Sequence, residues 1–339
     1  MGDSSSSMDD TAAPLVPPMT KATNVFMNTV ENPDGSVTRP EIPLLPPSPA
    51  GTKVVSRDVP LDAALGTYLR LFLPTTTTTT TKEDDDEESS KLPVILYFHG
   101  GGFVLFSPAT VCYHGFCESM SAAVPCIVAS LEYRLAPEHR LPAAYDAAAA
   151  AVRWLADADA ARADPWIAAR ADLSRCFAMG GSSGGNMAFF AGLRCTSSNK
   201  DDVLQGLLLH QPYLGGEART PSEAASADDA MLPLEASDKL WRLALPPGAD
   251  RDHPFCNPAK SLPHDAVAGL PRCLVTGNAG DPLIDRQREF VAWLRDRGVH
   301  VVDKTEFTGY HAVELFVPEK AQELFDAVRE FVFADDDRA

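Results

Sequence analysis

The sequence predicts an α/β fold whose central sheet is mostly parallel, with helices on both faces. From about residue 92 to residue 335, short apolar runs alternate with helical patterns, as expected for parallel strands connected by helices. A second observation is a serine among glycines, which stands between a strand-like and a helix-like run at residues 175–194. The length of 339 residues fits one large domain that carries a smaller cap.

The N-terminal quarter differs in composition from the rest of the chain. Residues 1–13 are mostly polar, and we expect them to be disordered. Residues 53–59 and 66–73 alternate apolar and polar side chains, which predicts the edge strands of an antiparallel hairpin. Residues 75–90 begin with seven threonines and continue with mostly acidic residues. Such a segment cannot bury apolar surface, and we expect a disordered acidic loop.

The next predicted strand leads into a glycine-rich turn. The apolar run 94–98 is typical of a buried strand, and the sequence His99-Gly100-Gly101-Gly102 follows it directly. Glycine has no Cβ atom, so the N–H groups of this turn can come within hydrogen-bond distance of a tetrahedral oxyanion. Loss of one such donor typically costs roughly 3 kcal/mol of transition-state stabilisation. The turn is therefore a candidate oxyanion hole.

The glycines around Ser182 and Ser183 predict a sharp turn between a strand and a helix. A nucleophile elbow needs residues without bulky side chains two positions before and two positions after the serine. Ser182 meets this condition with Gly180 and Gly184, and Ser183 meets it with the glycines one position further on. Steric arguments alone cannot decide which of the two serines is the nucleophile.

A candidate acid follows the strand-like run 273–276. Asp281 lies just past the C-terminal end of this run, at the sheet edge where open α/β sheets bind their ligands. Asp285 is the rival carboxylate, but it falls in the first turn of the helix predicted over 283–297, where its charge complements the helix dipole. We therefore assign the acid to Asp281.

The candidate base is His311, which follows the strand-like run 301–307 in the same way. His210 precedes the candidate aspartate in the chain, which breaks the order Ser, Asp, His of a nucleophile-elbow enzyme. His300 stands at the start of its strand and therefore belongs at the opposite edge of a parallel sheet.

The chain resembles the plant carboxylesterases, which belong to the hormone-sensitive-lipase-like group of α/β-hydrolases. The resemblance covers about residues 50–335 and implies an α/β-hydrolase fold with a helical cap. It rests on six ordered motifs: His-Gly-Gly-Gly-Phe at 99–103, Glu-Tyr-Arg-Leu-Ala-Pro-Glu-His at 132–139, Pro-Tyr-Leu-Gly-Gly at 212–216, Arg-Thr-Pro-Ser-Glu at 219–223, Gly-Ala-Asp-Arg-Asp-His-Pro at 248–254 and Gly-Asp-Pro-Leu-Ile-Asp at 280–285.

The resemblance also implies a role for each site residue. The family pattern Gly-x-Ser-x-Gly-Gly-Asn selects Ser182 as the nucleophile. The implied site consists of the catalytic Ser182, Asp281 and His311 and the oxyanion-hole N–H groups of Gly101, Gly102 and Ser183. One position departs from the family, which usually has Asp immediately before the serine, where this chain has Gly181. The extra backbone freedom of glycine puts the rigidity of the elbow in question.

The motif at 132–139 is implied to be a structural turn. Glu138 and His139 look catalytic in isolation, but the resemblance favours a turn that Arg134 and Pro137 anchor.

In this family two segments form a cap over the catalytic domain. They correspond here to residues 14–50 and 214–255, and the catalytic domain corresponds to residues 51–335. Both segments are rich in apolar residues, which suggests a mostly apolar pocket that selects esters by size, at about 1–3 kcal/mol per methylene. We expect three aromatic side chains to bind substrate: Phe103, Tyr213 and Trp241.

Composition limits the partners and the location of the protein. The formal net charge is −18 and the pI is about 4.8, which disfavour nucleic acid and anionic membranes as partners. Seven cysteines show no paired spacing, which is typical of a reducing compartment, and the chain has no signal-peptide pattern and no run of 18 apolar residues. We expect a cytoplasmic protein, with a nuclear fraction left open. Neither a metal nor a cofactor is expected, and the oligomeric state is open.

The sequence therefore predicts a serine carboxylesterase that acts on small, mostly apolar esters through an acyl-enzyme. One alternative is a hormone receptor on the same scaffold, but such receptors replace the histidine of the triad with an aliphatic residue, and this chain keeps His311. Another is a dehydratase or lyase, whose relatives can carry threonine at the nucleophile, where this chain has Ser182.

Overall fold

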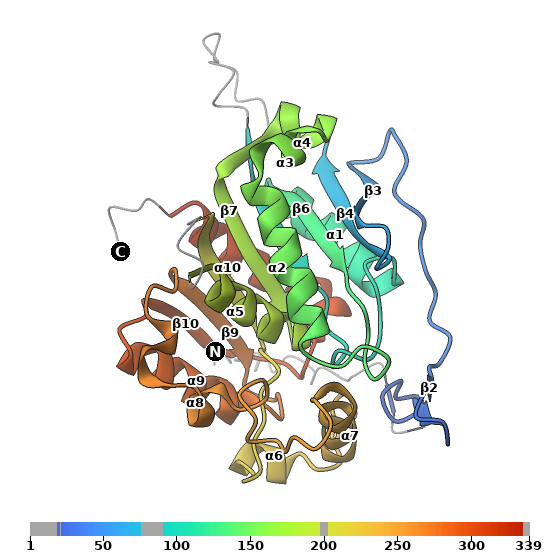
Figure 1. The fold of residues 1–339 in the computed structure, drawn as a ribbon, viewed down its shortest axis with the longest axis vertical. Helices are drawn as coiled ribbons and strands as arrows, with labels where there is room; N and C mark the ends of the chain where they lie inside the picture. Colours follow the sequence, from blue (N-terminus) through green and yellow to red (C-terminus); the bar gives the residue numbers. More distant parts are fainter. Residues whose placement is uncertain (1–18, 21, 76–90, 197–202, 335–339) are drawn as a thin grey trace, which may run out of the picture.

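The computed structural model describes residues 19–20, 22–75, 91–196 and 203–334. The predicted disordered N-terminus at 1–13 lies outside the described residues, and so does the predicted acidic loop at 75–90, apart from its first residue. The described part consists of a large sheet with helices on both sides and, at one end, the segment that carries α6 and α7 (Figure 1).

An eight-stranded sheet forms the centre of the molecule, in the order β10-β9-β8-β7-β5-β6-β4-β3. Six neighbouring strands, from β10 to β6, run parallel, and β4 runs antiparallel to both β6 and β3. The strands are β3 (Val54–Asp62), β4 (Thr67–Pro74), β5 (Leu92–Phe98), β6 (Ile127–Glu132), β7 (Ala171–Gly181), β8 (Leu204–His210), β9 (Cys273–Asn278) and β10 (Val301–Phe307).

The hairpin expected at residues 53–73 is present as β3 and β4, but only β3 is an edge strand. β4 lies between β3 and β6, and its last six residues are all buried. The alternation seen in the sequence cannot distinguish these two positions, because helices cover both faces of the sheet at β4.

Helices cover both faces of the sheet. On one face α1 and α10 pack against Ile95, Phe177 and Leu208, and on the other α2, α5 and α9 enclose the larger core. The helices are α1 (Val111–Ala123), α2 (Ala143–Ala156), α3 (Ala158–Arg162), α4 (Pro165–Arg170), α5 (Ser183–Thr196), α6 (Pro221–Ala225), α7 (Leu234–Ala244), α8 (Pro258–Ser261), α9 (Ile284–Asp296) and α10 (Pro318–Val332), with 3-10 turns η2 (His264–Val267) and η3 (Val313–Leu315). Over the part of the chain that the structure describes, none of these helices has the length and apolar character needed to span a membrane.

The parallel register brings the C-terminal ends of the central strands to one edge of the sheet. Phe98 of β5 pairs with Gly180 of β7, Gly181 pairs with His210 of β8, and His210 pairs with Thr276 of β9. The loops that follow these strands therefore emerge side by side, at the end of the molecule where α6 and α7 lie, away from α3 and α4 (Figure 1).

The N-terminal segment is bound to the segment that carries α7. It contains the short strands β1 (Val30–Glu31) and β2 (Val37–Thr38). The side-chain amide of Asn24 donates to the carbonyl oxygens of Ala230 and Met231, at 2.8 and 3.1 Å. Lys239 of α7 donates to the carbonyl oxygen of Thr29 at 2.9 Å.

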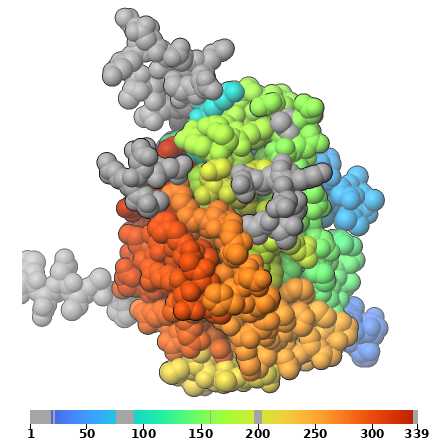
Figure 2. Space-filling model, turned by 60° about the vertical axis from the view of Figure 1, so that its left-hand side comes forward, coloured from blue at the N-terminus to red at the C-terminus, as the bar shows by residue number. Residues whose placement is uncertain are grey.

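In the space-filling view the α6 region, in yellow, lies at the lower end of the face formed by the C-terminal elements, in orange and red (Figure 2).

Candidate active site

The turn between β7 and α5 is built around Ser182. This residue has a φ of +55°, in the left-handed region that side chains other than glycine rarely adopt. A Cβ atom on Gly180 would overlap the backbone of Gly184, and one on Gly184 would overlap the carbonyl group of Phe98. A Cβ atom on Gly181 would make only ordinary contacts, the nearest at 3.6 Å. The two glycines that the turn requires therefore flank Ser182, which favours the register centred on this serine.

Ser182, His311 and Asp281 form one chain of hydrogen bonds. The Nε2 atom of His311 lies 3.0 Å from Oγ of Ser182, and its Nδ1 atom lies 2.9 Å from Oδ2 of Asp281. A carboxylate can only accept, so Nδ1 carries the hydrogen and donates it to Asp281. The lone pair of Nε2 therefore faces the Ser182 hydroxyl, ready to take its proton.

Asp281 is fixed by two further hydrogen bonds. Its carboxylate accepts from the backbone N–H of Leu283 at 2.9 Å and from the side-chain amide of Gln287 at 2.8 Å, and it is buried. Asp285 points elsewhere, since it accepts from the backbone N–H of Ser222 at 2.8 Å. Of the two candidate carboxylates, Asp281 is thus the one that reaches the histidine.

The electrostatic setting of His311 favours its protonated form. Burial lowers the pKa of His311, but the nearby carboxylates, foremost Asp281 through its charge and its hydrogen bond, together outweigh burial, and the net pKa lies above the ordinary value. Glu314 and Asp229 add to the increase. A histidine of this kind is a stronger base than a free imidazole.

We expect the pH dependence of turnover to reflect this raised pKa. A general base must be neutral, so kcat/KM for an uncharged ester falls as the pH drops through the pKa of His311, at a higher pH than for an ordinary histidine. Initial rates with p-nitrophenyl butyrate in buffers of constant ionic strength measure the profile. A flat profile between roughly pH 5 and pH 8 contradicts a histidine base.

The glycine turn after β5 lies against the elbow. A Cβ atom on Gly100 would stand 3.2 Å from Cβ of Ser182. Gly101 and Gly102 have φ angles of +112° and +62°, which explains the need for glycine at both positions. Among the hydrogen bonds between described residues, the N–H groups of Gly101, Gly102 and Ser183 are not donors. Unused donors beside a serine hydroxyl are the elements of an oxyanion hole.

A buried histidine supports the glycine turn. The Nδ1–H group of His99 donates to the carbonyl oxygen of Gly100 at 2.8 Å, and its ring stacks on Tyr133 with a centroid distance of 4.2 Å. Burial lowers the pKa of His99 to about 4, so the ring is neutral at physiological pH. The Tyr133 hydroxyl donates to the carbonyl oxygen of His99 at 3.0 Å, which holds the turn from its other side.

The three aromatic residues predicted to bind substrate pack against one another. Tyr213 and Trp241 stack with centroids 4.5 Å apart, and Phe103 lies 5.7 Å from Trp241. Each is about 1% exposed, so their rings are buried in a shared aromatic cluster. Leu240, beside Trp241, covers the glycine turn, because a Cβ atom on Gly102 would meet its Cδ1 atom at 2.6 Å. Their role in binding substrate remains a prediction.

A second serine–histidine pair lies outside this site. The Oγ atom of Ser48 is 2.9 Å from Nε2 of His114 and also contacts Glu118. The Nδ1 atom of this histidine faces the guanidinium of Arg70 at 3.3 Å, and a guanidinium can only donate. Nδ1 must therefore accept, which leaves the hydrogen on Nε2. His114 cannot remove a proton from Ser48, and the cluster ties residue 48 to α1.

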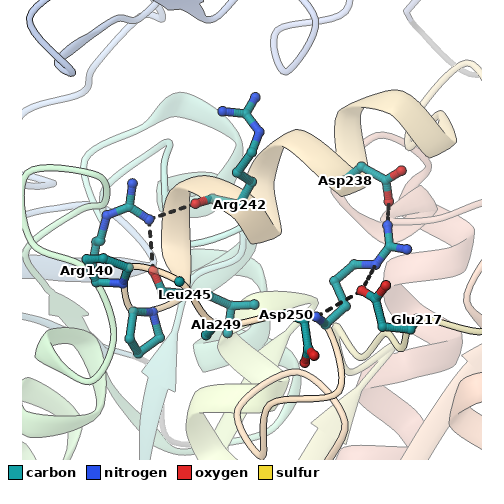
Figure 3. Close-up of a pocket in the computed structure, with 11 residues that line it drawn as sticks. Arg140, Glu217, Asp238, Arg242, Leu245, Ala249 and Asp250 are labelled. Atoms are coloured by element: carbon teal, nitrogen blue, oxygen red, sulfur yellow. Dashed lines mark hydrogen bonds and ion pairs between the residues drawn. The ribbon is translucent and has the colours of Figure 1, made fainter.

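A charged pocket of about 570 Å³ lies beside α7, in the segment predicted to be the cap insertion (Figure 3). Arg140 donates to the carbonyl oxygens of Arg242 and Leu245, and Arg251 pairs with both Asp238 and Glu217. None of the three predicted catalytic residues lines it. The pocket lining contains as many carboxylates as arginines, so it offers no net positive charge for an anionic ligand.

Sequence reasoning missed one residue near the glycine turn. The charged partner of Glu138 is Arg39, at 2.6 Å. Arg39 also donates to the carbonyl oxygens of Val104 and Ala136, at 2.7 and 2.8 Å. The N-terminal segment is thus joined to the loop that follows the oxyanion turn. No local pattern indicates this contact, because the two residues of the ion pair are 99 positions apart.

Comparisons with known proteins agree with this geometry. A family model described as alpha/beta hydrolase fold matches residues 95–314. Probable carboxylesterase 8 of Arabidopsis thaliana is 40% identical, over 93% of this chain and 95% of its own. The 3-O-acetylpapaveroxine carboxylesterase CXE2 of Papaver somniferum is 44% identical, over 70% of this chain and 78% of its own.

Solved structures share the fold at lower sequence identity. An esterase from the archaeon Pyrobaculum calidifontis superposes with a TM-score of 0.67, at 24% identity, over 84% of this chain and 85% of its own. A fungal esterase from Rhizomucor miehei has a TM-score of 0.70, at 22% identity, over 82% and 81%. These comparisons confirm the predicted fold class and family: the chain belongs to the α/β-hydrolase family and, within its hormone-sensitive-lipase-like group, to the plant carboxylesterases.

Proposed function

We propose that this carboxylesterase hydrolyses small, mostly apolar esters with Ser182 as nucleophile, His311 as general base and Asp281 as the acid that orients the imidazole. The observation that carries the proposal is the continuous chain of hydrogen bonds from Oγ of Ser182 through the imidazole to the buried carboxylate. In an isolated serine the hydroxyl is a weak nucleophile, and an adjacent base that is itself oriented by a third group activates it.

The reaction proceeds in two steps. Oγ of Ser182 bonds to the ester carbonyl carbon while Nε2 of His311 takes the hydroxyl proton, and the N–H groups of Gly101, Gly102 and Ser183 stabilise the oxyanion. The carbon–oxygen bond to the alcohol then breaks, and the imidazolium returns its proton to the leaving alkoxide. A water molecule attacks the acyl-enzyme in the same way and releases the carboxylic acid and the free serine.

The two segments at 14–50 and 214–255 are proposed to cap this site. The contacts of Asn24 and Lys239 support the proposal, since they join the N-terminal segment to the segment with α7. Leu240 lies on the glycine turn, and the residues around it are apolar. Carboxylates at positions 229, 281 and 314 act on His311, which favours neutral over anionic esters. The cytoplasmic location remains a prediction from the sequence.

A covalent probe tests the proposed function. We expect a fluorophosphonate to modify the purified protein at Ser182, as mapped by peptide mass spectrometry, and to abolish its turnover of p-nitrophenyl butyrate. We also expect faster turnover of phenyl acetate than of 4-acetoxybenzoate, an ester of similar size that carries a negative charge. A folded sample that shows neither labelling nor turnover contradicts the proposal and points instead to a protein that binds a ligand without hydrolysing it.

A further inference from the structure

A second buried histidine–carboxylate pair lies directly beside the nucleophile elbow. His210 is the last residue of β8, and its carbonyl oxygen accepts the backbone N–H of Ser182 at 2.9 Å. Its Nδ1 atom contacts Oγ1 of Thr276 at 2.6 Å, and its Nε2 atom lies 3.0 Å from Oε2 of Glu314. Both His210 and Glu314 are buried. The reaction steps proposed above use neither side chain.

Glu314 and the proposed base share one short turn. Glu314 belongs to η3, three residues after His311, and Ala312 between them has a φ of +63°. The backbone N–H of Ala312 donates to the side-chain oxygen of Gln211 at 2.7 Å. The turn is therefore held against the end of β8 at two places, by Gln211 through a hydrogen bond and by the contact between His210 and Glu314.

The Glu314 carboxylate is only partly compensated. Its Oε2 atom and Nε2 of His210 lie at ion-pair distance, yet neither makes a hydrogen bond within the described residues, so the contact is electrostatic. His210 is its only ion-pair partner in the described part of the chain. A buried carboxylate without full compensation stabilises any positive charge that forms close to it.

Among the titratable groups near the Glu314 carboxylate, His210 and His311 are the ones that can carry a positive charge. Besides these, the titratable groups that it influences are Tyr97, Cys112, Tyr113 and Tyr310. Burial raises the pKa of each of them, that of Cys112 to about 11, so all four are neutral at physiological pH. Asp281 and Asp229 are the other carboxylates that act on His311.

We propose that Glu314 is a positioning residue of this active site, which holds the turn carrying His311 against the elbow and stabilises the imidazolium formed when Ser182 loses its proton. The inference rests on the proposed function, because it assigns a second carboxylate to the same base. Asp281 orients the ring through Nδ1, whereas Glu314 acts through the turn and through its charge. This division gives a role to a carboxylate that is buried beside the elbow and whose Oε2 atom makes no hydrogen bond within the described residues.

The first test is Glu314→Gln, which keeps the shape and removes the charge. We expect kcat for p-nitrophenyl butyrate to fall about tenfold, the equivalent of one pKa unit of imidazolium stabilisation, with KM unchanged. The acidic limb of the kcat/KM profile should move to lower pH, so that the ratio of variant to wild-type rate rises as the pH falls. Asp164→Asn is the matched control, because Asp164 is also a buried carboxylate with one ion pair, to Arg57, but lies before β7 at the opposite edge of the sheet.

The second test introduces a new carboxylate on β7, close to the position of the Glu314 carboxylate. A Cβ atom on Gly181 would lie 3.6 Å from Cδ2 of His210 and 4.0 Å from Oε1 of Glu314, so a side chain fits there. In the wild type, Gly181→Asp sets two carboxylates against each other, and we expect it to lower both Tm and kcat. In the Glu314→Gln background the same substitution replaces the lost charge, and we expect kcat to rise above that of the single variant.

The outcomes separate this inference from the proposed function. A Glu314→Gln protein with a lower Tm but the wild-type pH profile overturns the inference, since Glu314 then only neutralises His210 in the core. Fluorophosphonate labelling of wild-type Ser182 continues in that case, whereas absence of wild-type labelling contradicts the proposed function itself. Where Glu314→Gln does not fold, the double variant decides: a folded, active protein supports the inference, and an unfolded or inactive one overturns it.

Discussion

Replacement of Ser182 by alanine is expected to lower kcat for p-nitrophenyl butyrate on the order of 10⁶-fold, with little change in Tm. The substitution removes the hydroxyl that Nε2 of His311 contacts, at 3.0 Å, and leaves the fold of the elbow in place. Single-turnover and steady-state rates measured with active-site-titrated wild-type enzyme give the ratio. Such a loss is far larger than any effect of stability on a folded enzyme.

Ser183→Ala is the matched control for this prediction. Ser183 is the first residue of α5, its side chain is buried, and the proposed mechanism uses only its backbone N–H group. Alanine retains that N–H group, and we expect the variant to keep most of its turnover. Loss of activity in Ser183→Ala together with retained activity in Ser182→Ala assigns the nucleophile to Ser183 instead.

Asp281→Asn is expected to lower kcat about 10⁴-fold while KM changes little. The asparagine amide donates where the carboxylate accepted, so the imidazole takes the tautomer whose hydrogen is on Nε2, and His311 can no longer remove a proton from Ser182. The same amide also faces the donor group of Gln287. Steady-state kinetics and the rate of fluorophosphonate labelling should decrease together.

Asp285→Asn separates this effect from a general loss of charge. Asp285 lies four residues further on and accepts from Ser222 rather than from His311. We expect its replacement to leave kcat within a few-fold of the wild type and to lower Tm slightly, as typical for one lost charge-assisted hydrogen bond. If Asp285→Asn were the inactive variant and Asp281→Asn the active one, the assignment of the acid would be wrong.

The strands, and the proximity of the candidate catalytic residues to one another, could be predicted from apolar runs in the sequence and from the positions of these residues after the strands. All seven residues of β5 are buried, and a short run that is apolar throughout indicates a central parallel strand. Asp281 and His311 come after consecutive strands β9 and β10, which pair in parallel, so their loops meet at one edge. The order of the strands in the chain and their parallel direction were therefore enough to predict that these two residues lie near Ser182.

Contacts between distant side chains could not be predicted in this way. The pair of Arg39 and Glu138 depends on the path of the N-terminal segment across the molecule, which no local pattern encodes. The apolar character of the cap segment suggested that Trp241 binds substrate, but it could not show that the ring of Trp241 stacks on the ring of Tyr213. The contact of Glu314 likewise depends on how η3 folds back onto β8.

The positive φ of Ser182 has a consequence for how such a protein evolves. A residue with a side chain held in the left-handed region carries a strain of order 1–3 kcal/mol, which glycine would relieve. Selection for thermodynamic stability alone would favour glycine at position 182, in a segment that is already rich in it. If Ser182 is the nucleophile, as proposed, a lineage released from the need for catalysis should lose this serine early, with its fold intact and somewhat more stable.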